Sequence, residues 1–211
     1  MATLQTFQKY NDPDLARVIG EQLGEAGIKY VIEGDHLHLD PVIVGNTPEP
    51  LISLKINAAD FVRAHALLEA YYEKQLDDID PEYYLFTFTD QELLDILAKP
   101  DEWGHFDYVL SRKLLIERGY DITPELTERL KKQRLEELGQ YDDKELKKTA
   151  PLLGMGVMSG YAVSEQKKIL PDGREVYAYS PTARKRGRIF FILGIIALTL
   201  ILLKMLLTRN H

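Results

Sequence analysis

Residues 189–207 read IFFILGIIALTLILLKMLL and contain a single charged residue, Lys204. A helix of this length rises about 28 Å, close to the ~30 Å hydrocarbon core of a bilayer. The ammonium of Lys204, near the far end, can extend to the lipid headgroups. The stretch therefore predicts a transmembrane helix over 189–207. The alternative, a buried core helix, would require a covering apolar surface that the acidic remainder of the chain does not readily supply.

Charge is divided unevenly along the 211 residues. Residues 1–149 contain 17 Lys and Arg against 30 Asp and Glu, whereas residues 150–211 contain 9 against 3. There is no cysteine, which excludes disulfide frameworks, thiolate metal sites and cysteine nucleophiles. The composition, 45% hydrophobic and 28% charged, is too polar for a multi-span transporter. We therefore expect an acidic globular part joined to a basic, apolar tail.

Basic residues crowd the N-terminal side of the predicted span, and on the other side only Arg209 follows it. The predicted membrane-interface residues are Arg184, Lys185, Arg186, Arg188 and Lys204. The positive-inside rule places the bulk of the chain in the cytoplasm, at a bacterial inner membrane, with anionic lipid attracting the basic cluster. Nucleic-acid binding is the rival interpretation of the basic run, but the acidic part would repel phosphate. We predict membrane lipid as a partner and no nucleic acid.

Two segments precede the span. Residues 150–163 read APLLGMGVMSGYAV, which is too short for a comfortable crossing and predicts an interfacial or short membrane segment. A second span, giving a membrane hairpin, is the alternative. Residues 164–188 form a basic loop in which Pro171, Asp172 and Gly173 indicate a tight turn between two short extended stretches.

The first 76 residues alternate between strand and helix patterns. A strand is predicted near Leu4, and Asp12-Pro13 supplies an N-cap and a first-turn proline for a helix ending at Gly27. Gly20 and Gly24 would let this helix approach a sheet closely. Its expected apolar face consists of Leu15, Val18, Ile19, Leu23 and Ala26.

Further strands are predicted over 28–32 and 51–56, before a helix opened by Asn57 and Asp60. The buried side of that helix is expected to contain Phe61, Ala64, Leu68 and Tyr72. The order β-α-β-(β)-β-α predicts the α+β class, with a sheet covered on one face by two helices.

The run LQTFQKYNDPDLARVIGEQLGEAGIKYVIEG, followed by LISLKINAADFVRAHALLEAYYE, resembles the small bacterial family of prokaryotic signal-transducing domains related in fold to PII. The step Ala26-Gly27-Ile28 is one of its marks. The resemblance implies a small ferredoxin-like or PII-like β-α-β-β-α domain over 1–76. Residues 88–122 and 167–189 resemble segments that accompany this domain in membrane-tethered bacterial proteins. The nucleotide-binding constellation of PII has no counterpart here, so no ligand residues are carried over.

The middle of the chain is predicted to be helical over 89–149. Thr89 and Glu92 form a capping box, a second helix closes at Gly119, and a third begins at Thr123-Pro124. Residues 77–88 are an acidic and aromatic connector. Its alternating aromatic residues also permit an extra strand, an inter-domain packing seam or a peptide-binding groove, and they are Tyr83, Tyr84, Phe86 and Phe88.

Metal ligation is the sharpest chemical hypothesis. His36 and His38 would share one face of a strand, as two imidazole ligands require, but an exposed polar strand face is the favoured explanation of this pattern. His65 is expected to be a packing or capping residue, and His105 is expected either at the surface or in staple packing beside Trp103 and Phe106. The acidic run at 77–82 lacks the glycine and terminal glutamate of a calcium loop. No nucleophile elbow or phosphate-binding loop is present, so we predict neither catalysis nor a cofactor.

These patterns predict a non-catalytic, membrane-anchored cytoplasmic regulatory or adaptor protein, with a signal-transducing role implied by the resemblance. A protein partner at the inner membrane would bind the open sheet face or the 34–50 region. The alternative is a small-ligand or metal-responsive sensor using the 34–50 region with His36 and His38.

Overall fold

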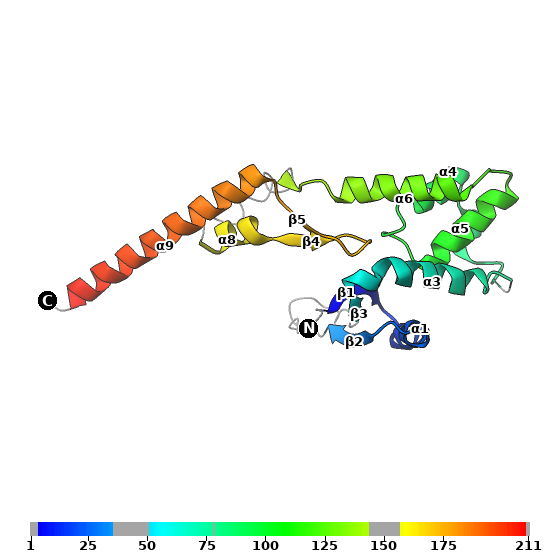
Figure 1. Ribbon diagram of the computed structural model, residues 1–211, viewed down its shortest axis with the longest axis horizontal. Coiled ribbons are helices and arrows are strands. Elements are labelled where there is room, and N and C mark those ends of the chain that lie inside the picture. The colour runs from blue at the N-terminus through cyan, green and yellow to red at the C-terminus, as the bar shows by residue number, and fades with distance from the viewer. Residues whose placement is uncertain (1–3, 36–50, 78, 144–156, 210–211) are drawn as a thin grey trace. The chain divides into compact units, whose positions relative to one another are not determined.

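The computed structural model describes residues 4–35, 51–77, 79–143 and 157–209 (Figure 1). By its contacts the chain divides into two compact units. Unit 1 comprises Met1–Glu136 with Pro171–Arg174, and unit 2 comprises Glu137–Leu170 with Glu175–His211.

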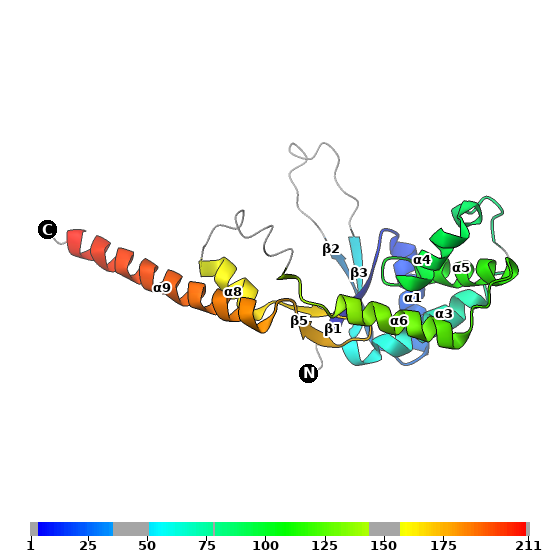
Figure 2. The ribbon, with the colours of Figure 1, turned by 90° about the horizontal axis from the view of Figure 1, so that it is seen from above.

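Unit 1 begins with a three-stranded sheet whose strands are β1 (Leu4–Tyr10), β2 (Tyr30–Asp35) and β3 (Leu51–Asn57). The spatial order is β1-β3-β2, and β3 is antiparallel to both neighbours. Helix α1 (Pro13–Glu25) connects the parallel strands β1 and β2, which gives a split β-α-β arrangement (Figure 2). The predicted α+β class is confirmed.

Local signals set the ends of α1. The Asp12 side chain accepts a hydrogen bond from the backbone N–H of Asp14 at 2.8 Å, and a proline occupies the first turn. The helix ends before Gly27, whose φ of 76° is a conformation that residues with a side chain rarely adopt. Both predicted boundaries are confirmed.

The buried face of α1 differs from the expected one. Ala16, Ile19, Gly20 and Leu23 are buried, whereas Leu15 is 40% exposed. Because successive residues of a helix are separated by about 100°, a face centred on Ile19 and Leu23 includes Ala16 and turns Leu15 toward solvent.

The glycines of α1 have the packing role that their spacing indicated. A Cβ added at Gly20 would lie 2.5 Å from the ring of Tyr30, and one at Gly24 would lie 3.1 Å from it. The Tyr30 ring of β2 therefore occupies the space that side chains at these positions would fill.

We expect Gly20→Ala to destabilise unit 1 by about 1–3 kcal/mol, because the new methyl group overlaps the Tyr30 ring. Gly24→Ala is the matched control, since its Cβ would be only slightly crowded. Urea unfolding of the detergent-solubilised full chain, followed by fluorescence of Trp103, the single tryptophan, measures both. Equal stability of the two variants would contradict the packing described here.

The second helix also begins as predicted. The side chain of Asn57 accepts from the N–H of Ala59 at 3.1 Å and caps the 3-10 helix η1 (Ala58–Asp60), which leads into α3 (Phe61–Glu73). The buried residues of α3 are Phe61, Ala64 and Leu68, with Tyr72 partly buried. The optional strand expected within 34–50 falls almost wholly outside the described residues.

The connector does not form an extra strand. Residues Tyr84–Thr87 form the 3-10 helix η2, with Leu85 buried and Phe86 exposed. Tyr83 and Phe88 pack against the core of the following helices, so the expected packing seam is found in part of the aromatic run. The N–H groups of Phe86 and Phe88 donate to the carbonyl oxygens three residues earlier, so this backbone bonds within a tight turn and not to a neighbouring strand.

Three helices follow in unit 1. They are α4 (Asp90–Ala98), α5 (His105–Glu117) and α6 (Pro124–Leu138). The capping box is formed as predicted, because Thr89 and Glu92 each bond the other's backbone N–H. Leu85 and the apolar residues of α4 and α5 build one core cluster. Residues 144–149 of the predicted helical segment lie outside the described residues.

Unit 2 contains a helix, a hairpin and a long helix. These are α8 (Val157–Glu165), β4 (Lys167–Ile169), β5 (Glu175–Tyr177) and α9 (Pro181–Arg209). Strands β4 and β5 are antiparallel, as the predicted turn requires. The last part of the predicted loop is helical, because α9 begins at Pro181, eight residues before the predicted span. Ser180 explains this start: its hydroxyl accepts from the N–H of Ala183 at 3.2 Å.

Candidate functional site

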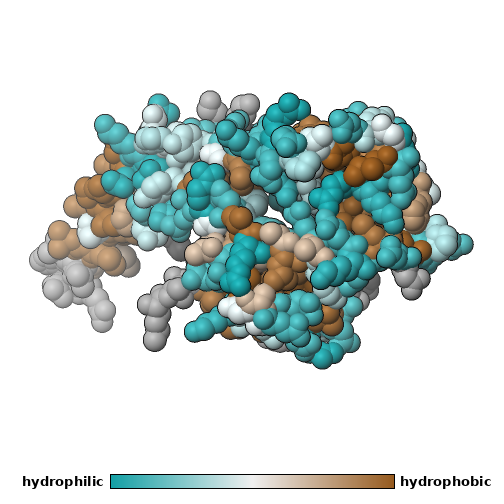
Figure 3. All heavy atoms as spheres, turned by 45° about the vertical axis from the view of Figure 1, so that its right-hand side comes forward, coloured by the Kyte–Doolittle hydropathy of each residue, from teal (hydrophilic) through white to brown (hydrophobic). Residues whose placement is uncertain are grey.

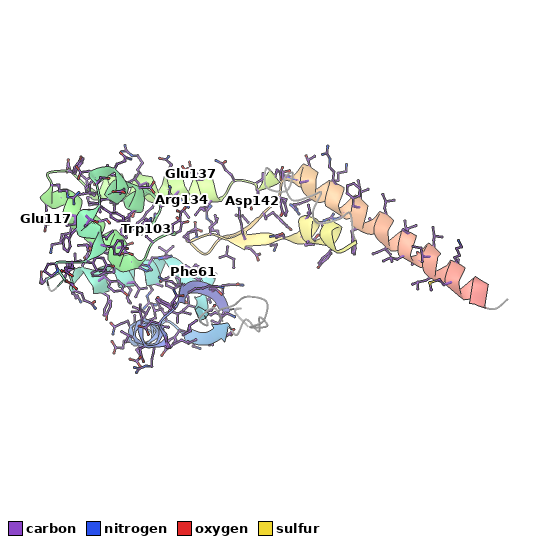
Figure 4. All side chains as sticks on the ribbon, turned by 180° about the vertical axis from the view of Figure 1, so that it is seen from behind. Phe61, Trp103, Glu117, Arg134, Glu137 and Asp142 are labelled. Atoms are coloured by element: carbon purple, nitrogen blue, oxygen red, sulfur yellow. The ribbon has the colours of Figure 1, made fainter. Side chains whose placement is uncertain are left out.

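The long helix α9 presents apolar side chains to its surroundings on all sides. Residues Pro181–Met205 form one candidate membrane span by length and composition, and its most apolar window is not buried at all. Figure 4 shows side chains projecting around α9 beyond α8, and Figure 3 shows a hydrophobic surface over this helix. The alternative of a buried core helix is contradicted. A continuous apolar surface of this extent is typical of contact with lipid or protein.

The basic cluster lies on the first two turns of α9 and has two kinds of member. The guanidinium of Arg184 lies 3.2 Å from the centre of the Tyr177 ring, and its Nε donates to the carbonyl oxygen of Ser164 at 3.2 Å. Arg188 reaches the carboxylate of Glu165 at 3.3 Å. These two residues connect α9 to α8 and to the hairpin.

Lys185 and Arg186 are exposed, and among the described residues neither has an ion-pair partner. They are therefore the members of the predicted interface set best placed to meet lipid phosphates. Lys204 is exposed near the far end of the helix, at the position from which an ammonium can extend to headgroups.

The two kinds of basic residue predict different effects of substitution. Arg184→Ala should raise hydrogen–deuterium exchange of the α8 amides about 2- to 12-fold, because the lost hydrogen bond to the Ser164 carbonyl of α8 is worth about 0.5–1.5 kcal/mol. Lys185→Ala, the matched control one residue away, should leave that exchange unchanged. Mass spectrometry on the full chain in lipid nanodiscs measures both. Equal effects would show that Arg184 has no special structural role.

The predicted metal ligands His36 and His38 lie outside the described residues. Within the described ranges, no group of three or more His, Cys, Asp or Glu side chains is arranged to hold a metal ion. The acidic connector residues Asp77, Asp80 and Glu82 are accordingly in no such group.

A histidine pair in unit 1 was not predicted from the sequence. Nδ1 of His65 on α3 lies 2.8 Å from Nε2 of His105 on α5, and the ring of Phe7 lies 4.7 Å from that of His65. Burial lowers the pKa of His65 to about 4 and that of His105 to about 3, with further lowering from nearby Lys131. Both rings are therefore neutral at pH 7. The packing roles expected for them are confirmed, and the surface position for His105 is wrong.

Polar contacts continue from this pair along α3. Glu69 accepts from Nζ of Lys131 on α6 at 2.8 Å, and Glu73 pairs with Arg112 on α5. His65, Glu69 and Glu73 are spaced four residues apart, which puts them on one helix face. That spacing was the signal available in the sequence, but the partners come from elements 39 to 62 residues away.

A second polar contact joins α6 to the loop after α4. Arg134, labelled in Figure 4, donates two hydrogen bonds to Asp101, at 2.8 and 2.9 Å, and a third to Glu102. Its hydrogen bonds to Asp101, and the negative charges of Asp101 and Glu102, raise the pKa of the Arg134 guanidinium above its ordinary value. The contacts hold unit 1 together by paired polar groups as well as by its apolar core.

The histidine pair predicts acid sensitivity. Below pH 6.5 an unfolded histidine binds a proton that the folded protein excludes, so the free energy of unfolding should fall between pH 6.5 and about 4. For His65 alone the loss is about 2–3 kcal/mol. Urea unfolding of the solubilised full chain at a series of pH values measures it. The double variant His65→Leu with His105→Leu should have a smaller pH dependence; an unchanged dependence would contradict the assignment.

The sheet has one face on the helix side and one polar face. The register aligns Gln8, Leu54 and Ile32 on the first, and Thr6, Lys55 and Val31 on the other. On the polar face Lys55 pairs with Glu33, while Val31 is 40% exposed. This face is the part of the predicted recognition surface that the structure describes.

Comparison with known proteins adds no identification, since no family model, no curated protein and no solved structure matches the chain.

Proposed function

We propose that this protein is a non-catalytic regulatory or adaptor module anchored in a bacterial inner membrane by α9. The observation that supports the proposal most strongly is the unburied apolar surface of α9, which water solvates poorly and lipid accommodates well. A helix also satisfies all of its own backbone hydrogen bonds, as a spanning segment must.

The charges support an orientation with the N-terminal unit in the cytoplasm. Four basic residues occupy the first two turns of α9, and unit 1 belongs to the acidic part of the chain. Basic residues beside a span are retained on the cytoplasmic side. Anionic lipid would attract Lys185 and Arg186 at about 1 kcal/mol each.

The recognition module in this proposal is the α+β part of unit 1, a ferredoxin-like or PII-like domain. The split β-α-β arrangement followed by α3 supports this finer assignment. The polar sheet face with Val31 is the surface offered to a protein partner in the same membrane. Tethering both proteins to one bilayer raises their effective concentration, so weak contacts suffice. The described residues contain no feature that favours the sensor alternative.

Membrane fractionation tests the anchor. The full chain should sediment with membranes and resist carbonate extraction, and a reporter after His211 should be periplasmic. Replacing Ile195 and Leu198 by lysine should move the chain toward the supernatant, because each charge at the bilayer centre costs about 2.5–3.5 kcal/mol. The matched control replaces both residues by alanine and should stay in the membrane. Recovery of the unaltered full chain in the supernatant would refute the anchor.

Site-specific crosslinking tests the recognition surface. A photoreactive amino acid at Val31 should form a discrete adduct with a membrane protein in intact cells. The same residue at Val62, which is exposed on α3, is the control and should not form that adduct. The same adducts from both positions would contradict recognition through the sheet face.

A further inference from the structure

Helix α8 packs antiparallel along the beginning of α9. Gly160 lies against Gly187 and Phe191, so closely that a Cβ at Gly160 would be 2.7 Å from the carbonyl oxygen of Gly187 and from the backbone N of Phe191. Four residues later in α8, the Ser164 carbonyl accepts from Arg184 of α9. Residues later in α8 therefore contact residues earlier in α9, so the two helices are antiparallel. The beginning of α8 points toward the apolar part of α9 (Figure 1).

The chain on both sides of α8 is fixed near the start of α9. Before it, the N–H of Asp142 donates to the carbonyl of Ala178 at 2.8 Å, and the Asp143 carboxylate accepts from the N–H of Ser180 at 3.0 Å. At its end Glu165 pairs with Arg188, and directly after it the carbonyl of Gln166 accepts from the N–H of Ala178 at 3.0 Å. The partner residues Ala178, Ser180 and Arg188 all precede the apolar run at 189–207. A crossing between Asp143 and Glu165 would need to be followed by a return crossing.

The contacts also give the depth of α8. Gly160 and Tyr161 lie beside Phe191, which is already inside the apolar run, and the two rings have centres 5.5 Å apart. Helix α8 begins three residues before Gly160, about 4.5 Å further along α9. Its nine residues span about 14 Å, less than half of a hydrocarbon core.

We propose that α8 is a second lipid-contacting element, whose beginning lies in the bilayer beside α9 and whose end lies at the cytoplasmic surface. The exposed ring of Tyr161 then lies at the headgroup boundary, where tyrosine is enriched, and the Glu165–Arg188 pair lies on the aqueous side. The Gly160–Gly187 approach holds the pair together, because helices in lipid associate by close packing of small residues. This inference rests on the proposed membrane anchor.

Single-cysteine probes test the proposal on the full chain, which has no cysteine of its own. A bimane label is placed at Ala162 on the exposed side of α8, at Gln166 just after α8, and at Ile196 in α9. The chain is placed in vesicles of phosphatidylethanolamine and phosphatidylglycerol. Lipids with a shallow nitroxide should quench the label at Ala162, and lipids with a deep nitroxide should quench the label at Ile196. Aqueous iodide should quench the label at Gln166 several-fold more than that at Ala162.

The outcomes separate this inference from the anchor. If iodide quenches Ala162 as strongly as Gln166 while Ile196 stays in lipid, α8 lies in water and the inference fails alone. If Ile196 is also quenched by iodide, the anchor itself fails. If deep nitroxides quench Ala162 as strongly as Ile196, the shallow element is refuted in favour of a deeper one.

A packing variant gives an independent check. Gly160→Leu should separate α8 from α9 and raise iodide quenching of the label at Ala162 several-fold, because its side chain has no room against Gly187. The control is Ile192→Leu, an isomeric change at an exposed residue of α9, which should leave the quenching unchanged. Unchanged quenching in Gly160→Leu would overturn the proposed packing.

Discussion

Exposing the apolar surface of α9 to water costs a large amount of free energy. Within the described residues, the rest of unit 2 packs only against the beginning of this helix and leaves that surface uncovered. Burying one large aliphatic side chain is worth about 1.5–3 kcal/mol, and more than ten such residues are exposed between Ile189 and Met205. The Ser180 cap, the Arg184–Tyr177 contact and the Gly160–Gly187 approach all lie at the beginning of this helix. Together these contacts form a folded region at the point where the chain reaches the apolar segment.

Unit 1 depends on a different kind of interaction. The α+β part and the helices that follow it are joined through α3 and α5, where His65, Glu69 and Glu73 meet partners from α5 and α6. Partly buried polar groups of this kind lose hydrogen bonds to water on folding unless each finds a partner, so they favour one arrangement of the helices over alternatives that apolar contacts alone would allow.

A tethered module also has particular requirements for its surface. In the proposed orientation, anionic headgroups would repel the acidic part of the chain and would attract the basic residues of α9. Recognition is then left to surfaces that carry both polar and apolar groups, such as the sheet face with Glu33, Lys55 and Val31. The acidic character of residues 1–149 and the basic character of residues 150–211 follow from their charged side chains and do not depend on the fold.

The sequence by itself determined the local features: the Asp12 and Thr89 caps, the turn at Pro171–Gly173, the α+β class and the apolar C-terminal helix. Each depends on residues within one or two turns of one another, so periodicity and capping chemistry suffice. Only the tertiary structure decided that His65 meets His105, that Tyr83–Phe88 makes no strand, and that Arg184 contacts Tyr177 while Lys185 is exposed. Those outcomes depend on partners distant in sequence, whose positions are fixed by packing of whole elements.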